Sequence, residues 1–209
     1  MSPSQAPDPK RRCLLAAAGA GAAGGLLQGW APAAVAAAAA TVYAQPPTVE
    51  LRADGAYASA SVVFALPIPL EDALRRGIPL SFLTRLRVTQ ARWWWFDSTL
   101  GEGHMLTRLG YEPLLDKYRV SAGALRTTYS SLDEALDQVQ HISRLKVADA
   151  SVLKAGQRYE VGGSFELDLS RLPRPFQLNV GSQADWQLQA DFPQVSFLWT
   201  PAPSTAPHA

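Results

Sequence analysis

The residues best suited to chemistry follow a run of three tryptophans, in the stretch QARWWWFDSTLGEGH at residues 90–104. Asp97, Glu102 and His104 lie close together there, and each can bind a metal ion or transfer a proton. The other two histidines, His141 and His208, lie far away in the sequence. A zinc site would have to combine one histidine with carboxylates alone, so we predict neither a metal site nor a cofactor.

The sequence lacks the motifs that assemble other catalytic groups. It has no nucleophile elbow, no glycine-rich phosphate-binding loop, no paired-histidine zinc motif and no dinucleotide-binding fingerprint. Its one cysteine, Cys13, lies near the N-terminus in a leader segment, so the rest of the chain has no thiol nucleophile, disulfide or thiolate metal site. We therefore predict no catalytic residues.

The tryptophan run has two interpretations. Successive side chains of a strand point to opposite faces, so Trp93 and Trp95 share one face while Trp94 lies on the other. In the first interpretation, the run ends a central strand that is covered on both sides, and the tryptophans are core. In the second, Arg92, Trp93 and Trp95 form a partly exposed aromatic platform for a partner, and these three are the candidate binding residues.

The first 44 residues have the pattern of an export signal peptide. Lys10, Arg11 and Arg12 precede a long run of small and apolar residues, and small residues before Thr41 and Gln45 predict cleavage after Ala40 or Ala44. The string KRRCLL also resembles a twin-arginine signal, with ordinary unfolded export as the alternative. If it is not cleaved, the apolar run is long enough to remain as a membrane anchor.

The rest of the chain has the size and charge of one ordinary domain. The leader holds three of the 19 Lys+Arg residues and one of the 18 Asp+Glu residues, which leaves 16 basic and 17 acidic residues, a net charge of −1. This balance argues against a nucleic-acid partner. About 165 residues remain, enough for a single domain. We expect a β-rich domain at residues 45–200 and a disordered Pro/Ala tail at 201–209.

The order of short apolar segments predicts a mainly β fold, an antiparallel β-sandwich or open barrel with two short amphipathic helices. The predicted strands cover residues 57–66, 82–96, 118–129, 145–153, 157–169, 184–189 and 195–199, with a β-bulge near Thr89 and a loop at DSTLGEGH. SLDEALDQVQHIS predicts a helix that Ser131 caps and whose buried face runs from Leu132 to Ile142. LEDALRRG predicts a shorter helix that Gly77 ends.

Several longer strings, in the same order, resemble one family. They are FALPIPLEDALRRGIPLSF, RWWWFD, RLGYEPLLDKYRVS, TTYSSLDEAL, LKAGQRYEV and LDLSRLPRPFQL, followed by DWQL and a final strand with a tryptophan. With these strings the chain resembles the exported proteobacterial proteins of domain-of-unknown-function family four-three-nine-zero, also labelled proline-rich signal-peptide proteins. The resemblance implies a bacterial envelope setting and supplies no activity, substrate or catalytic residue.

These observations favour an exported protein of the periplasm or cell envelope that binds a protein or glycan partner without catalysing a reaction. A binding surface needs only exposed aromatic and arginine side chains on a rigid sheet, whereas catalysis needs a nucleophile, base or metal with an orienting partner. The alternative is a hydrolase or a metal-dependent enzyme of the envelope. Contact with the membrane is expected only through the N-terminal segment, if it stays uncleaved.

The leader generates the first testable prediction. Sequencing of the mature protein from the envelope should give an N-terminus at Thr41 or Gln45, because small residues precede both bonds. A chain that still begins at Met1 or Ser2 would contradict cleavage and favour the anchored form. Replacing Arg11 and Arg12 with lysine separates the routes, because only twin-arginine export requires both arginines.

Overall fold

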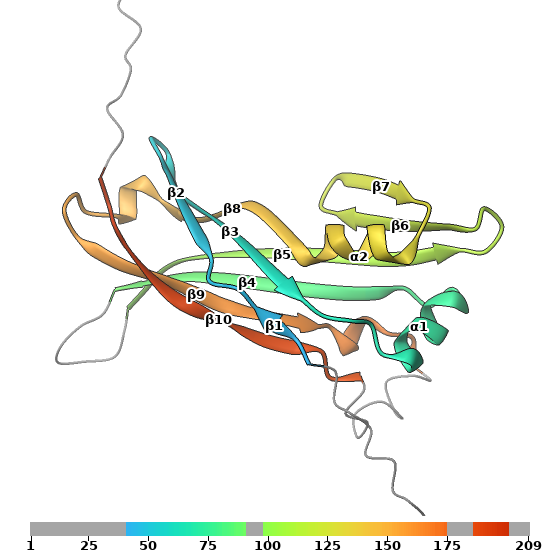
Figure 1. Ribbon diagram of the computed structural model, residues 1–209. Coiled ribbons are helices and arrows are strands. Elements are labelled where there is room, and N and C mark those ends of the chain that lie inside the picture. Colours follow the sequence, from blue (N-terminus) through green and yellow to red (C-terminus); the bar gives the residue numbers. More distant parts are fainter. Residues whose placement is uncertain (1–40, 91–97, 175–185, 201–209) are drawn as a thin grey trace, which may run out of the picture. The chain divides into compact units, whose positions relative to one another are not determined.

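The computed structural model describes residues 41–90, 98–174 and 186–200 (Figure 1). The strands are β1 (Tyr43–Ala44), β2 (Thr48–Arg52), β3 (Gly55–Val63), β4 (Leu80–Gln90), β5 (Ser98–Glu112), β6 (Lys117–Ala122), β7 (Leu125–Tyr129), β8 (His141–Asp149), β9 (Arg158–Leu167) and β10 (Gln189–Leu198). The helices are α1 (Ile68–Arg75) and α2 (Leu132–Gln140), with short 3-10 turns η1 (Ala150–Val152) and η2 (Leu169–Arg171).

The strands form two antiparallel sheets. The large sheet has the order β10-β9-β4-β5-β6-β7, and in the small sheet β3 pairs with β1, β2 and β8. Within the described residues, neither sheet closes into a barrel. The prediction of a mainly β, antiparallel fold with two short helices is therefore confirmed.

The inner face of the large sheet supplies much of the core. In β4, the alternate residues Leu80, Phe82, Leu86 and Val88 are fully buried, as the period of two in a strand requires. Phe82 lies 5.7 Å from Phe165 of β9 and from Phe64, which follows β3, measured between ring centroids. This aromatic cluster joins the two layers at the end of the sheets near α1.

The small sheet covers this inner face, together with α2, which leads directly into β8 (Figure 1). Its central strand β3 turns three alanines toward the core, Ala56, Ala58 and Ala60, all of them buried. Small side chains at these positions allow the two layers to approach closely. One close approach is that of β8 to two glycines of β5.

At Gly101 and Gly103 of β5, the backbone of β8 occupies the place of a side chain. A Cβ atom built on Gly101 would lie 2.3 Å from the carbonyl oxygen of Val147, and one built on Gly103 would lie 2.3 Å from that of Lys146. Both distances are far below van der Waals contact. Glycine is therefore required at these two positions by the packing of the layers, not by backbone conformation.

Both predicted helices are present. In α2, the Ser131 side chain accepts a hydrogen bond from the backbone N–H of Glu134, and Ala135, Leu136 and Val139 are buried. The helix ends at Gln140, so the expectation that its buried face extends to Ile142 was wrong: Ile142 is buried as part of β8. Neither α1 nor α2 has the length and hydropathy needed to cross a membrane.

Helix α1 follows its prediction closely. Leu70, Ala73 and Leu74 are buried, and Glu71 pairs with Arg75 at 2.6 Å. Gly77 then adopts a φ of 82°, which ends the helix because other residues rarely take this left-handed conformation.

Several strand predictions needed correction. The stretch predicted as a loop, DSTLGEGH, belongs to β5 from Ser98 onward, because its glycines fit against β8. The strand predicted at residues 118–129 is a hairpin of β6 and β7, which turns at Gly123 with a φ of 58°. Strands β1 and β2 were missed. The strand predicted at residues 145–153 ends at Asp149, and residues 186–188 of the one predicted at 184–189 are not in a strand. The predicted bulge near Thr89 is confirmed by a register shift between Val88 and Thr89.

The first strand bears on the cleavage of the leader. Tyr43 and Ala44 form β1 and pair with Val63 and Val62 of β3. A cut after Ala44 would remove this strand, whereas a cut after Ala40 would retain it.

The close approach of β8 to β5 generates a stability prediction. Gly103→Ala should lower the free energy of unfolding by about 1 to 3 kcal/mol, because the new methyl group would overlap a backbone carbonyl that cannot move freely. Urea unfolding measures the change. Gly110→Ala on the same strand is the control, since no atom lies within 4 Å of its Cβ position. Equal stability of the two variants would contradict the packing described above.

Candidate functional site

The predicted aromatic platform lies outside the described residues. Arg92, Trp93 and Trp95 belong to the segment 91–97, and Gln90 and Ser98 on either side of it pair as the ends of β4 and β5. The choice between core and platform for these tryptophans therefore stays open, and the binding role of the three residues stays a prediction.

The histidines do not come together. His104 is exposed on β5, opposite Arg85 of β4. His141 is exposed at the start of β8, in the other layer, where its Nδ1 lies 2.8 Å from the carbonyl oxygen of Asp137. His208 and Asp97 lie outside the described residues. Among the residues that the structure describes, no three His, Cys, Asp or Glu side chains are grouped as metal ligands.

The side of the large sheet that points away from the small sheet is polar. We call this side the outer face. Arg85, the central residue of this face, pairs with Glu166 at 3.4 Å. Arg87 lies opposite Glu102, and His104, two residues further along β5, lies opposite Arg85. The polar residues at its centre are Arg85, Arg87, Thr89, Glu102, His104, Ser164, Glu166 and Asp191.

The centre of the outer face is open. Arg87, Glu102, His104 and Asp191 are exposed, so no described helix or strand covers it. None of these four side chains makes an ion pair with another residue that the structure describes. A solvated face is common for antiparallel sheets. What distinguishes this one is a hollow beside Arg87.

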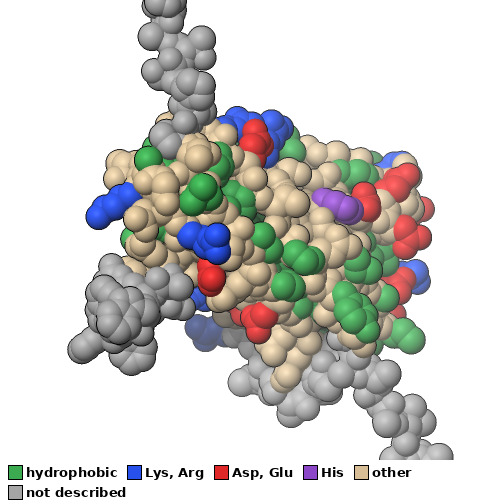
Figure 2. Space-filling view, turned by 60° about the vertical axis from the view of Figure 1, so that its left-hand side comes forward, with side chains coloured by type: hydrophobic (Ala, Val, Ile, Leu, Met, Phe, Trp, Pro, Cys, Tyr) green, Lys and Arg blue, Asp and Glu red, His purple; other side chains and the backbone are tan. Residues whose placement is uncertain are grey.

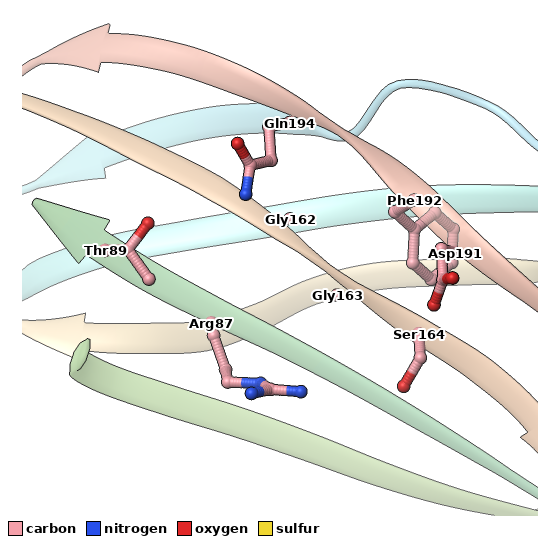
Figure 3. Close-up of a pocket in the computed structure, with 8 residues that line it drawn as sticks. All are labelled: Arg87, Thr89, Gly162, Gly163, Ser164, Asp191, Phe192 and Gln194. Carbon is pink, nitrogen blue, oxygen red and sulfur yellow. The ribbon is translucent and has the colours of Figure 1, made fainter. Parts of the chain in front are cut away.

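The hollow has a volume of about 290 Å³ and lies across β4, β9 and β10 (Figure 3). Its floor is made by Gly162 and Gly163, which leave no side chains in the middle of β9. A register shift between Phe192 and Val195 of β10 places Gln194 at its edge. Figure 3 shows Arg87, Ser164 and Asp191 reaching it from three neighbouring strands.

The hollow can bind a ligand by hydrogen bonds. Arg87 is a donor, Asp191 an acceptor, and Thr89, Ser164 and Gln194 can be both. This mixture suits hydroxyl groups of a glycan or the backbone of a peptide. The signals in the sequence were the glycine pair inside a strand and Pro193 within another strand, since both mark irregular pairing. Neither signal shows that the two places adjoin.

A second polar group lies on the exposed side of the small sheet and centres on Tyr57. Its hydroxyl donates to Asp54 at 2.5 Å, and Lys146 lies 3.3 Å from Asp54 and 2.8 Å from Asp149. The guanidinium of Arg52 lies 5.1 Å from the centre of the Tyr57 ring. These contacts join the β2–β3 turn to β8.

The hydrogen bonds and charges of this group shift the pKa values of its members away from neutral pH. The hydrogen bond from Tyr57 and the ammonium of Lys146 lower the pKa of Asp54, and the same bond to Asp54 raises the pKa of Tyr57. Bonding to Asp149, and then to Asp54, raises the pKa of Lys146. All three residues therefore stay in their ordinary charge states near neutral pH, which suits a structural role.

The rest of the surface offers no single dominant charged patch in the view of Figure 2. There, charged side chains lie in small groups separated by neutral and hydrophobic ones. This distribution agrees with the near-zero net charge of the chain.

Comparison with known proteins identifies a family. The family model "Domain of unknown function (DUF4390)" matches residues 39–196. The chain belongs to the DUF4390 family. The resemblance noted in the sequence is thus confirmed, and the match includes both sheets of this DUF4390 protein almost completely. Comparisons with curated proteins and with solved structures gave no match.

The Tyr57 group generates a prediction about pH. The lowered pKa of Asp54 stabilises the fold at pH values above the usual pKa of 3.8. This stabilisation is lost as the pH falls through the lowered pKa. The raised pKa values of Tyr57 and Lys146 stabilise the fold at pH values below their usual pKa values of 10.0 and 10.5. This stabilisation is lost as the pH rises through the raised pKa values. Tyr57→Phe should therefore lower the melting temperature near neutral pH and have little effect at either extreme.

Thermal unfolding followed by circular dichroism measures this difference. Tyr43→Phe is the matched control, because Tyr43 is 67% exposed and its hydroxyl makes no hydrogen bond to a described residue. A Tyr57→Phe effect that does not change with pH would show that the hydroxyl acts by packing alone.

Proposed function

We propose that this DUF4390 protein is a non-enzymatic binding module of the bacterial cell envelope, and that it binds a protein or glycan partner on the outer face of its large sheet. One observation supports the proposal above all. The centre of this face is uncovered in the described structure, and its charged residues Arg87, Glu102 and Asp191 make no ion pair with a described residue. Their hydrogen-bonding capacity is available to a partner.

The sheet provides a rigid support for such a surface. Arg85 and Arg87 extend from β4, which pairs with β5 on one side and β9 on the other. Behind them, Leu86 and Val88 are fully buried in the core. Side chains held on regular strands lose little backbone freedom on binding, which favours affinity.

The hollow beside Arg87 gives the face its specificity in this proposal. Its donors and acceptors surround a floor of two glycines, so a ligand group can approach the backbone of β9 closely. A sugar ring or a peptide turn has the size and the hydroxyl or amide groups to match. The predicted platform of Arg92, Trp93 and Trp95 would add stacking contacts, because these residues follow β4 directly in the chain.

The cellular location is part of the proposal. The leader at residues 1–44 has the composition of an export signal, and export would place the domain in the periplasm or on the envelope. The alternative function is a hydrolase or metal-dependent enzyme. In the described residues, His104 and His141 lie in different layers, so they do not form a shared site.

Site-specific crosslinking in envelope preparations tests the proposal. A photoreactive residue at His104, on the outer face, should give a partner adduct, whereas the same residue at His141, in the other layer, should give none. Arg87→Ala with Asp191→Ala should weaken binding of that partner by at least about tenfold, since charged hydrogen bonds are lost while the fold is kept.

Two outcomes would contradict the proposal. Adducts of equal strength from His104 and His141 would show that the outer face is not the binding surface. Stoichiometric zinc that is lost in His104→Ala and kept in His141→Ala would favour the metal-dependent enzyme instead. For the platform, Trp93→Ala and Trp95→Ala variants that fold normally and keep full partner binding would exclude a contribution of the tryptophans.

A further inference from the structure

Three arginines surround a second hollow at the other end of the large sheet. It has a volume of about 440 Å³, and Arg108, Arg119 and Arg126 line it from the neighbouring strands β5, β6 and β7. Figure 1 shows β6 and β7 as a hairpin beside the end of β5. Among the described residues, the two hollows have no lining residue in common.

The strand register directs these arginines to one side of the sheet. Arg108 of β5 lies opposite Ser121 of β6, which in turn lies opposite Arg126 of β7. Arg119 lies two residues before Ser121 on the same strand and so on the same face. Neighbouring strands are about 4.8 Å apart, so Arg108 and Arg126 start about 10 Å apart with the Ser121 hydroxyl between them. Arginine side chains are long enough to meet over this distance.

The floor of the hollow is open. Gly110 lies opposite Arg119, and no atom lies within 4 Å of the position where a Cβ would stand on it. The same is true of Gly123, where the hairpin turns. Two positions around the arginines therefore contribute no side chain, and a ligand group can settle between the guanidinium groups.

The described residues do not balance the charge of the hollow. Glu112, the one acidic residue among its described lining residues, forms an ion pair with Arg119. Neither Arg108 nor Arg126 has a carboxylate of the described residues within 4 Å. Three arginines against one glutamate leave a charge of +2 here, although the whole chain carries only +1. Like charges on adjacent strands repel each other and cost stability unless an anion binds between them.

We propose that this hollow is an anion-binding site for a phosphate-type oxyanion, with Arg108 and Arg126 as its main ligands and Ser121 as a hydrogen-bond donor. The planar guanidinium group presents paired N–H donors that match the oxygens of a phosphate. The phosphate is either that of a soluble ester or that of a phospholipid headgroup. The site does not depend on the binding function proposed for the centre of the outer face, because different residues form it.

A titration of the intact protein with inorganic phosphate tests the site, and ¹H–¹⁵N NMR spectra record the binding. The amide signals of Gly110 and Ser121 should shift with saturation, and binding should weaken as sodium chloride is added. Arg108→Gln and Arg126→Gln should each weaken binding on the order of tenfold. Arg158→Gln is the control, since this exposed arginine lies on β9 of the same sheet and lines neither hollow.

Melting temperatures show whether the arginine variants are still folded. At low salt without phosphate, Arg108→Gln and Arg126→Gln should melt at or above the temperature of the intact protein, because repulsion is relieved. At one phosphate concentration, the melting temperature of the intact protein and of Arg158→Gln should then rise more than that of the other two variants. Binding to vesicles of phosphatidylglycerol and of phosphatidylcholine shows whether a lipid headgroup is the source of the phosphate. Selective binding to phosphatidylglycerol that inorganic phosphate competes away indicates the lipid. The absence of such binding indicates a soluble ester.

Two results would overturn the proposal. One is the absence of saturable phosphate binding by the intact protein. The other is binding that Arg158→Gln weakens as strongly as Arg108→Gln, which would indicate general attraction to positive charge. Neither result would affect the crosslinking at His104, so the two hypotheses are tested separately.

Discussion

The contact between β8 and two glycines of β5 is the constraint on which the arrangement of the layers depends. Carbonyl oxygens of Val147 and Lys146 lie where the side chains of residues 101 and 103 would otherwise stand. Because β8 also pairs with β3 and continues from α2, this contact positions the small sheet and the longer helix together over the large sheet. Core packing at native density leaves no room to shift such a contact by even one methyl group.

The same arrangement explains why one face of the large sheet is polar. The small sheet and α2 both lie on the inner face, where Phe82, Leu86 and Val88 are buried. No second helical layer is described on the opposite side, so Arg87 and His104 remain exposed. A side chain on this face can be contacted without disturbing the core, and both hollows lie on this face.

The two hollows arise from the same device, a glycine in a strand of polar residues. Gly162 and Gly163 open the sheet beside Arg87, and Gly110 opens it between Arg108 and Arg119. The first hollow mixes donors with an acceptor, whereas three arginines and one glutamate give the second a net positive charge. The Tyr57 group on the other layer differs from both, since its charges are paired with one another and serve to join strands.

Local patterns in the sequence were enough for much of the fold. The capping of α2 by Ser131, the end of α1 at Gly77 and the bulge near Thr89 depend on residues close together in the chain, and all three were predicted correctly. The family resemblance was also correct. By contrast, β5 was read as a loop at its start because glycines usually weaken strands. Their fit against β8 overrides this preference, and β8 lies more than forty residues away.

The sequence by itself determined the residue types of a candidate site, and only the tertiary structure decided which of them adjoin. Arg92, Trp93 and Trp95 were chosen because they are neighbours in the chain, but the hollow beside Arg87 combines residues of three strands that span about a hundred positions. Arg108 and Arg126 likewise line one hollow because of the register of β5, β6 and β7. Strand pairing is set by the burial of whole faces, a long-range condition that no short motif records.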